Sequence, residues 1–286
     1  MSEFHIEIES QYVGGRHPVT IIMPDPPRVN PPRTFFENGK KYKVLWLLHG
    51  TYGTNNDWLN RSMIEVFACE RNLIVVMPHG MNLDYVNWPG SGIGTNMYDY
   101  LFEELMPMVY NWLPASDKRE DNFIAGLSMG GSGAMVYALG HPEKFAAACS
   151  LSYPLMDPRQ QALEVTDRLV ATPAHLQGFR PVRWENQLHN AGGYEAYLKS
   201  PANTWDRLQE AVDNGVDLPE LFFCIGADDF LYERYKIFKQ YAQDHNFPIT
   251  FAEEAGMRHE WRFWNQYIEI FIKRYICENK VEGLSF

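Results

Sequence analysis

The stretch Gly126-Leu127-Ser128-Met129-Gly130 has the pattern G-x-S-x-G and decides how the rest of the chain is interpreted. It follows the apolar run 122–125, which predicts a buried strand, and precedes the small residues of 131–134, which predict a helix. A turn that lifts a serine above a sheet edge needs a strained backbone and a close approach of strand to helix, so only small residues fit beside it. The pattern therefore predicts Ser128 as a nucleophile on a strand-to-helix turn.

Strand and helix patterns alternate along the whole chain. Short apolar runs bounded by turn residues predict strands at 19–23, 43–48, 73–77, 122–127, 146–151, 221–225 and 249–252. Helical periodicity falls between them, at 57–71, 97–112, 130–139, 231–243 and 261–275. This alternation predicts an α/β fold with a mostly parallel central sheet, helices on both faces and an edge hairpin at the start. The catalytic groups of such sheets gather at the carboxyl ends of the strands.

One region interrupts this alternation of strand and helix patterns. Residues 154–218 contain no strong strand candidate, only helical fragments rich in Gln, Arg, Trp and Tyr. The insertion starts where the strand 146–151 ends, beside the expected site, and we interpret it as a cap within a single domain of residues 1–286. A purely structural excursion on the surface is the alternative, because long insertions cost little free energy.

Charge and composition narrow the classes of partner. The net charge is −11, which disfavours nucleic acid and anionic lipid surfaces. No apolar run approaches the roughly 18 residues of a membrane span, and residues 1–11 lack a secretory pattern, so we expect a cytoplasmic protein without membrane contact. The four cysteines have no C-x-x-C spacing, which predicts buried free thiols and no metal site.

A serine hydroxyl needs a base within hydrogen-bond reach and a third group to orient that base. In folds with this turn the chain order is serine, acid, histidine. Among nine histidines, order and position leave His259, which lies between the last predicted strand and the last predicted helix. The acid should follow the strand 221–225, where Asp228 and Asp229 are adjacent. Asp229 is preferred because it stands three residues after Gly226, and Asp228 is the alternative.

The reaction also needs donors for the oxygen that becomes negative in the tetrahedral intermediate. We expect one donor to be the backbone N–H of Met129, and the other to come from the loop after the strand 43–48. Thr51 is the first choice there and Tyr52 the second, while His49 is interpreted as structural. Tyr52, Trp88 and Trp261 are predicted to contact the substrate.

These motifs resemble an esterase family of the α/β-hydrolase fold. It includes tributyrin esterase, esterase D (S-formylglutathione hydrolase), feruloyl and acetylxylan esterases and the antigen 85 mycolyltransferases. The resemblance spans nearly the whole chain and rests on segments 47–50, 126–131, 218–232 and 256–264. In the tributyrin-esterase branch the acid matches Asp229 and the base matches His259. The insertion at 154–218 is longer than in compact members, so their substrate preferences do not transfer.

Taken together, these observations predict a serine carboxylic-ester hydrolase that needs no cofactor. The expected substrate is a small short-chain acyl ester or a hydroxycinnamoyl (feruloyl-type) ester, with a saccharide as a candidate alcohol. An S-formylglutathione-type thioesterase or an acyltransferase would use the same residues, and a non-catalytic binding protein would have lost one of them. The aromatic share of 14 % leaves a homo-oligomer open, because aromatic side chains also serve subunit contacts.

Overall fold

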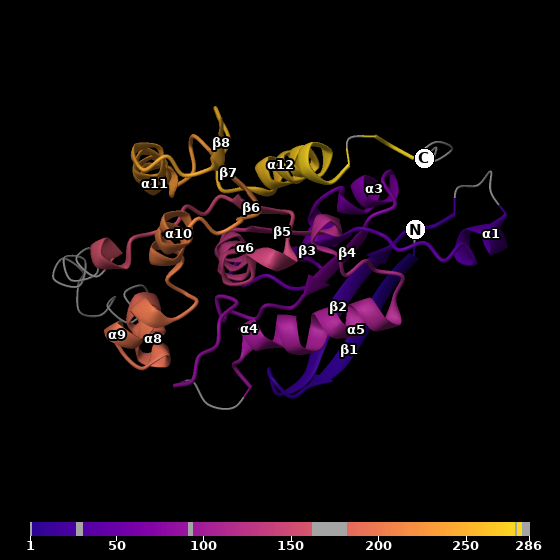
Figure 1. Cartoon of the computed structure of the whole chain (residues 1–286), viewed down its shortest axis with the longest axis horizontal. Helices are drawn as coiled ribbons and strands as arrows, with labels where there is room; N and C mark the ends of the chain where they lie inside the picture. Colours follow the sequence, from indigo (N-terminus) through magenta and orange to yellow (C-terminus); the bar gives the residue numbers. More distant parts are fainter. Residues whose placement is uncertain (1, 27–30, 91–93, 162–181, 278, 282–286) are drawn as a thin grey trace.

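An eight-stranded sheet runs through the centre of the molecule, in the order β1-β2-β4-β3-β5-β6-β7-β8 (Figure 1). The computed structural model describes residues 2–26, 31–90, 94–161, 182–277 and 279–281. The strands are β1 Ser2–Ser10, β2 Gly15–Met23, β3 Val44–Leu48, β4 Ile74–Pro78, β5 Asn122–Leu127, β6 Ala147–Leu151, β7 Glu220–Gly226 and β8 Ile249–Glu254. Each run of sequence predicted as a strand overlaps one of them, with ends that differ by at most a few residues.

Six of these strands, from β4 to β8 in the sheet order, pair in parallel. The first two form an antiparallel hairpin whose second strand pairs antiparallel with β4, so the predicted edge hairpin is confirmed. All residues of β3, β4, β5 and β6 are buried. Strands covered on both faces need mostly apolar side chains on both faces, which explains why these runs show no polar alternation.

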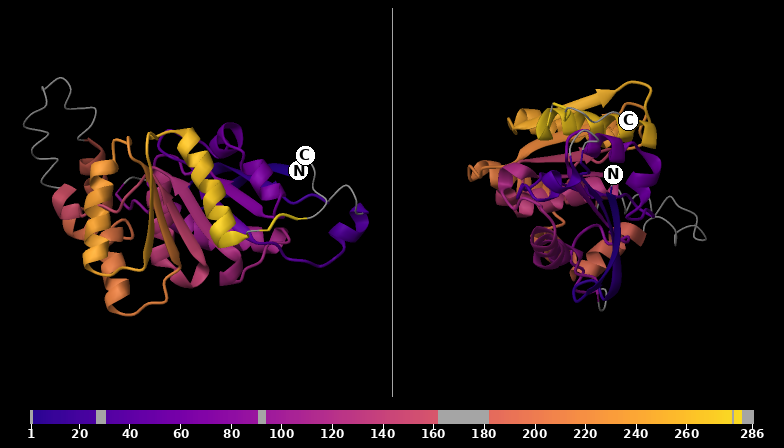
Figure 2. Two further views of the ribbon diagram at one scale, coloured as in Figure 1. Left: turned by 90° about the horizontal axis from the view of Figure 1, so that it is seen from above. Right: turned by 90° about the vertical axis from the view of Figure 1, so that its right-hand side faces the viewer.

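Helices cover both faces of the sheet (Figure 2). One face carries α4 Met97–Asp99, η1 Tyr100–Leu105, α5 Met106–Trp112, α6 Met129–Gly140, α10 Thr204–Asp213 and α11 Tyr232–Asp244. The other carries α2 Asp57–Arg61, α3 Ile64–Cys69, α12 Trp261–Phe271 and the π-helical turn η5 Ile272–Ile276. A short helix, α1 Pro32–Phe36, lies before β3. The predicted mixed α/β fold is confirmed.

Three predicted helices differ in detail, and the one at 261–275 does so by ending in the π-helical turn η5. The pattern at 57–71 forms two helices, α2 and α3, because the backbone N–H of Met63 leaves the helix and donates to Asn265 Oδ1 (2.7 Å). The pattern at 97–112 contains a π-helical stretch, Tyr100–Leu105, just before Pro107. A proline cannot donate to the carbonyl one turn earlier, and the wider turn accommodates that missing bond.

Between β6 and β7, the described residues 154–161 and 182–218 contain no strand. We call the described residues 154–161 and 182–218 the cap segment; residues 162–181 of the predicted cap lie outside the described part. Its helices include α8 Val182–Ala191, α9 Tyr194–Lys199 and α10, and residues 158–161 are helical as well. Figure 1 shows α8 and α9 to one side of the sheet, next to α10. Within the described residues, no helix has the length and apolar character to cross a bilayer.

Candidate active site

Ser128 stands between the end of β5 and the start of α6, at the carboxyl edge of the sheet. Its backbone has φ +52° and ψ −119°, a region that residues with a Cβ rarely adopt. Its backbone N–H donates to the carbonyl of Leu151 at the end of β6 (2.8 Å). Strain of this kind persists only where surrounding contacts hold it, and it is typical of functional sites.

The glycines of the motif allow backbone to pack on backbone. A Cβ on Gly126 would lie 2.2 Å from the carbonyl oxygen of Gly130. A Cβ on Gly130 would lie 2.4 Å from the carbonyl oxygen of Leu48, at the end of β3. No larger residue fits at either position, because real Cβ atoms do not approach other atoms so closely. The spacing of the motif is therefore a steric requirement of this turn.

Asp229 and His259 lie next to each other, although 30 residues separate them. Asp229 Oδ2 lies 2.8 Å from His259 Nδ1, and Asp229 Oδ1 accepts the backbone N–H of Leu231 (2.9 Å). The Asp229 side chain is fully buried, whereas His259 is about one-fifth exposed. An ionised carboxylate can only accept, so Nδ1 carries the proton and Nε2 has a lone pair to take another. The neighbouring Asp228 is exposed and does not share this contact.

Two aromatic rings flank the imidazole of His259. The Trp264 ring lies 5.0 Å away and perpendicular to it, and the Phe230 ring lies 4.7 Å away at 50°. Trp264 is buried, while Phe230 is 75 % exposed. Neither residue was predicted to belong to the site, although Phe230 directly follows Asp229 and both belong to segments that carry the resemblance.

His49 is buried in the loop after β3 and bonds to backbone on both sides. Its Nδ1 lies 2.7 Å from the carbonyl oxygen of Gly50, and its Nε2 lies 2.7 Å from the backbone nitrogen of Gly80. An amide N–H only donates, so Nε2 accepts and Nδ1 donates its proton to Gly50. Burial lowers the pKa of His49 to about 4, which keeps the ring neutral near pH 7. This bonding fits the structural interpretation of His49.

The predicted oxyanion residues lie on two elements. Met129 is the first residue of α6, where backbone N–H groups have no acceptor inside the helix. Thr51 and Tyr52 follow the bonded carbonyl of Gly50. The backbone N–H of Tyr52 donates to Asn82 Oδ1 (2.8 Å), so this amide already has a partner. Tyr52 itself is 90 % exposed.

Trp88 and Trp261, both predicted to contact the substrate, are held by protein contacts. Trp88 is only 2 % exposed, and its indole N–H donates to the carbonyl of Leu83 (2.8 Å). It packs with Trp184 and Tyr197 of the cap segment. This burial corrects our expectation for Trp88, which supports α8 and α9 here and offers almost no surface to a substrate. Trp261 is half-buried between Trp58 and Trp264.

Four cysteines and nine histidines are the chain's potential soft metal ligands. Cys69, Cys149 and Cys224 are buried free thiols, as predicted, and Cys277 is half-buried. Among the described residues, no three His, Cys, Asp or Glu side chains form a metal-binding group. The groups gathered at the carboxyl edge are those of nucleophilic chemistry: a serine, an imidazole and a buried carboxylate.

A strained serine between a parallel strand and a helix, with a histidine–carboxylate pair at the same sheet edge, defines the class of protein. The molecule is a serine hydrolase of the α/β-hydrolase fold. The chain belongs to the family described as "Putative esterase", whose sequence pattern matches residues 28–269. The protein is therefore a serine esterase.

Individual relatives agree with this class. The chain is 24 % identical over 232 residues to an acetyl esterase of Caldicellulosiruptor saccharolyticus, covering 81 % of this chain and 82 % of the relative. The structure is similar to that of fluorophosphonate-binding serine hydrolase F of Staphylococcus aureus, with a TM-score of 0.77, 27 % identity and coverage of 96 % and 98 %. It is also similar to an S-formylglutathione hydrolase from the same species, with a TM-score of 0.74, 27 % identity and coverage of 96 % and 100 %.

Proposed function

We propose that Ser128, His259 and Asp229 form the catalytic triad of a carboxylic-ester hydrolase. His259 Nε2 takes the proton of Ser128 as Oγ attacks the ester carbonyl, and then gives it to the leaving alcohol. Water attacks the resulting acyl-enzyme with the help of the same imidazole and releases the acid. Asp229 keeps the ring oriented and stabilises its charged form. The observation that carries this proposal is the 2.8 Å contact of the fully buried Asp229 carboxylate with His259.

The proposed oxyanion donors are the backbone N–H groups of Thr51 and Met129. Support for Thr51 comes from His49, which donates to the carbonyl of Gly50 (2.7 Å). In a trans peptide this carbonyl and the N–H of Thr51 point in opposite directions, so the bond from His49 fixes the direction of the Thr51 N–H. Support for Met129 comes from its place at the N-terminus of α6, the positive end of the helix dipole.

The central experiment replaces Ser128 with alanine. We expect Ser128→Ala to lose roughly 10⁴- to 10⁶-fold in kcat on p-nitrophenyl acetate, because the nucleophile is gone. The loss of fluorophosphonate labelling, read by intact mass and by peptide mapping of the wild-type adduct, gives a second readout. Ser132→Ala is the matched control, since Ser132 lies one turn further along α6. Full activity in Ser128→Ala, or a label on another residue, would contradict the proposal.

For the substrate we propose a short-chain acyl ester or a hydroxycinnamoyl ester, with a saccharide as one candidate alcohol. The acetyl esterase among the relatives supports the first. We also propose that residues 154–218 cap the site, because the cap segment leaves the sheet directly after β6. p-Nitrophenyl esters of rising chain length, assayed beside methyl ferulate and acetylated xylan oligomers, test the substrate class. A preference for long acyl chains would contradict it.

A thioesterase acting on S-formylglutathione is the second candidate, favoured by the similarity to the S-formylglutathione hydrolase. It would use the same three residues, so the discriminating measurement is kcat/KM on S-formylglutathione against short oxygen esters.

A cytoplasmic location is proposed on the basis of the free thiols, which suit a reducing compartment.

A further inference from the structure

A series of aromatic rings leads from Trp58 in α2 to the imidazole of His259. The rings of Trp58 and Trp261 lie 5.2 Å apart at 85°, and those of Trp261 and Trp264 lie 5.2 Å apart at 88°. The last contact, between Trp264 and His259, is 5.0 Å at 89°. Each pair has the edge-to-face geometry that aromatic rings prefer. Three tryptophans thus connect the candidate base to α2 through an unbroken series of ring contacts.

Both outer indoles are fixed to the ends of strands. Trp58 is buried, and its indole N–H donates to the carbonyl of Leu48, the last residue of β3 (2.9 Å). Trp264 is buried as well, and its indole N–H donates to Ser152 Oγ, one residue beyond β6 (3.0 Å). Buried polar groups with such bonds have little freedom to move. Each bond ties an outer ring to the end of a strand at one atom, the indole nitrogen, and leaves the tilt of the ring to its packing against Trp261.

Trp261 is this middle ring. It is the first residue of α12 and half-buried, and the Arg61 guanidinium lies 5.9 Å from its ring. Its two neighbours hold it at right angles from both sides. The hydrogen bond of His259 to Asp229 fixes one nitrogen but leaves the imidazole free to tilt about that bond. A perpendicular ring packed against the imidazole restricts this tilt.

We propose that Trp261 is a positioning residue for catalysis. By holding Trp264, it keeps the His259 imidazole at the tilt that the proposed proton transfer from Ser128 needs, and it links that tilt to the end of β3. The inference rests on the proposed function, in which His259 is the base. It departs from the sequence analysis, in which Trp261 was expected to bind substrate.

The two roles of Trp261 differ in kinetics. Loss of a substrate contact made equally in ground and transition states raises KM and leaves kcat unchanged. Loss of a correctly tilted base lowers kcat, and it also slows the reaction of Ser128 with a small fluorophosphonate, which needs the base but little of the ester site. The labelling rate therefore separates positioning from recognition.

The experiment compares Trp261→Leu with Trp261→Phe, which keeps an aromatic ring, and with Trp112→Leu as control. Trp112 is 72 % exposed and belongs to α5, on the other face of the sheet. For Trp261→Leu we expect kcat on p-nitrophenyl acetate and the second-order labelling rate to fall together by about three- to ten-fold, with KM within two-fold of wild type. Trp261→Phe should recover at least half of the loss, and Trp112→Leu should match wild type.

Two results would overturn the inference: an unchanged labelling rate in Trp261→Leu, or a change confined to KM. Thermal melting and circular dichroism check that each variant is folded. If Trp261→Leu does not fold, Trp261→Met takes its place, because methionine fills more of the space without a ring. Failure of the proposed function is distinguishable, since the wild-type protein itself would then not be labelled.

Discussion

The turn around Ser128 is packed backbone against backbone, whereas the helices between β6 and β7 are joined by side chains. At the turn, the strand before Ser128 and the helix after it approach so closely that Gly126 and Gly130 leave no room for a methyl group. Neighbouring main-chain atoms occupy the space around both glycines. A single added carbon must displace main chain, and main chain in a sheet moves only at high cost.

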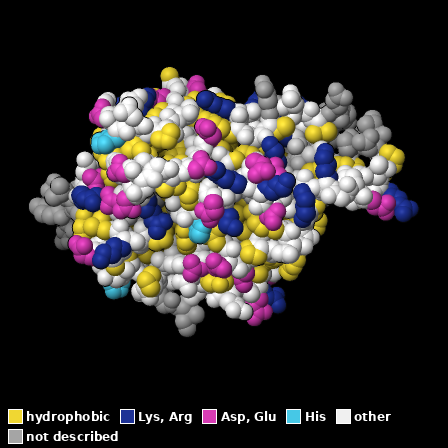
Figure 3. All heavy atoms as spheres, viewed as in Figure 1, with side chains coloured by type: hydrophobic (Ala, Val, Ile, Leu, Met, Phe, Trp, Pro, Cys, Tyr) yellow, Lys and Arg dark blue, Asp and Glu magenta, His cyan; other side chains and the backbone are white. Residues whose placement is uncertain are grey.

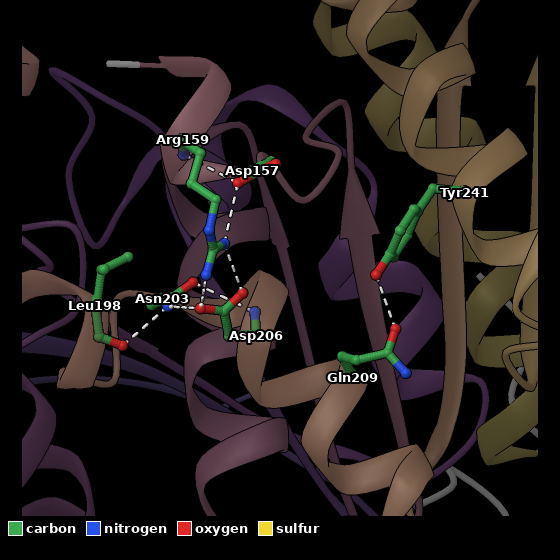
Figure 4. A network of polar contacts seen from close by, with 7 residues as sticks. All are labelled: Asp157, Arg159, Leu198, Asn203, Asp206, Gln209 and Tyr241. Carbon is green, nitrogen blue, oxygen red and sulfur yellow. Dashed lines mark hydrogen bonds and ion pairs between the residues drawn. The ribbon is translucent and has the colours of Figure 1, made fainter. Parts of the chain in front are cut away.

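The cap segment is held by individual side-chain hydrogen bonds, each of which can be lost without main-chain movement. Asp206 accepts two bonds from Arg159, both 2.9 Å, and a third from Asn203 (2.8 Å) (Figure 4). Tyr241 of α11 donates to Gln209 of α10 (2.8 Å). The Arg159 side chain is 54 % exposed, and exposed pairs contribute little to stability.

On the face that Figure 3 presents, acidic and basic groups are interspersed among apolar ones. The comparison teaches that a substitution of equal size should have very different effects in the two regions. Near Ser128 it changes the geometry of the reacting groups, and in the cap segment it changes one replaceable contact. Three measurements test this difference, beginning with the largest expected effect.

Gly130→Ala should be the most damaging of these substitutions. The new Cβ would overlap the carbonyl of Leu48, so we expect a loss of about 3 kcal/mol or more in the free energy of unfolding, together with loss of esterase activity. Gly193→Ala is the matched control in the cap segment. Gly193 has φ +109° but nothing within 4 Å of a new Cβ, so backbone strain alone should cost about 1–2 kcal/mol. Urea unfolding measures both, and equal costs would refute the comparison.

Acid should destabilise the folded protein through the buried His17 side chain on β2. Burial lowers the pKa of His17 to about 4, and among the described residues its Nε2 has no hydrogen-bond partner. Because the pKa is lower in the folded state than the unfolded value of about 6.5, the unfolded chain binds more protons between these values. Stability is therefore complete above about pH 6.5 and is lost as the pH falls towards 4.

His17→Leu removes this titrating group. Between pH 7 and pH 4.5 we expect it to lose about 2 kcal/mol less than the wild-type protein in the free energy of unfolding. His189→Leu controls for the loss of an imidazole at an exposed position of the cap segment. Urea titrations at the two pH values give the result, and identical pH dependence in wild type and His17→Leu would contradict this assignment.

Arg159→Gln should have the smallest effect. The hydrogen bond from Arg159 lowers the pKa of Asp206, so the pair contributes when the carboxylate is ionised and is lost as the pH falls through the lowered pKa. Since Arg159 is more than half exposed, the loss at pH 7 should stay below about 1 kcal/mol, with kcat unchanged. Thermal melting at pH 7 and esterase assays measure it. A loss in the free energy of unfolding above about 2 kcal/mol would contradict the expectation that this network contributes little to stability.

Much of the fold could be predicted because buried strands and amphipathic helices have local patterns. The strands from β3 to β8 lie where apolar runs predicted them. The break between α2 and α3 was missed because it depends on Asn265, about 200 residues away along the chain. The burial of Trp88 was missed for a similar reason, since its neighbours Trp184 and Tyr197 belong to helices whose position no local pattern gives.

By itself, the sequence determined the turn at Ser128, because the serine and the two glycines that the turn needs stand within five consecutive residues. Chain order and position also reduced the candidates for the base to His259, and position reduced the candidates for the acid to two adjacent aspartates. Only the tertiary structure decided that the Asp229 carboxylate, and not that of Asp228, contacts His259, and that Trp264 packs against the imidazole. The physical reason is range: strain in a turn is local, whereas burial, ring contacts and hydrogen bonds between loops depend on how distant strands are brought together.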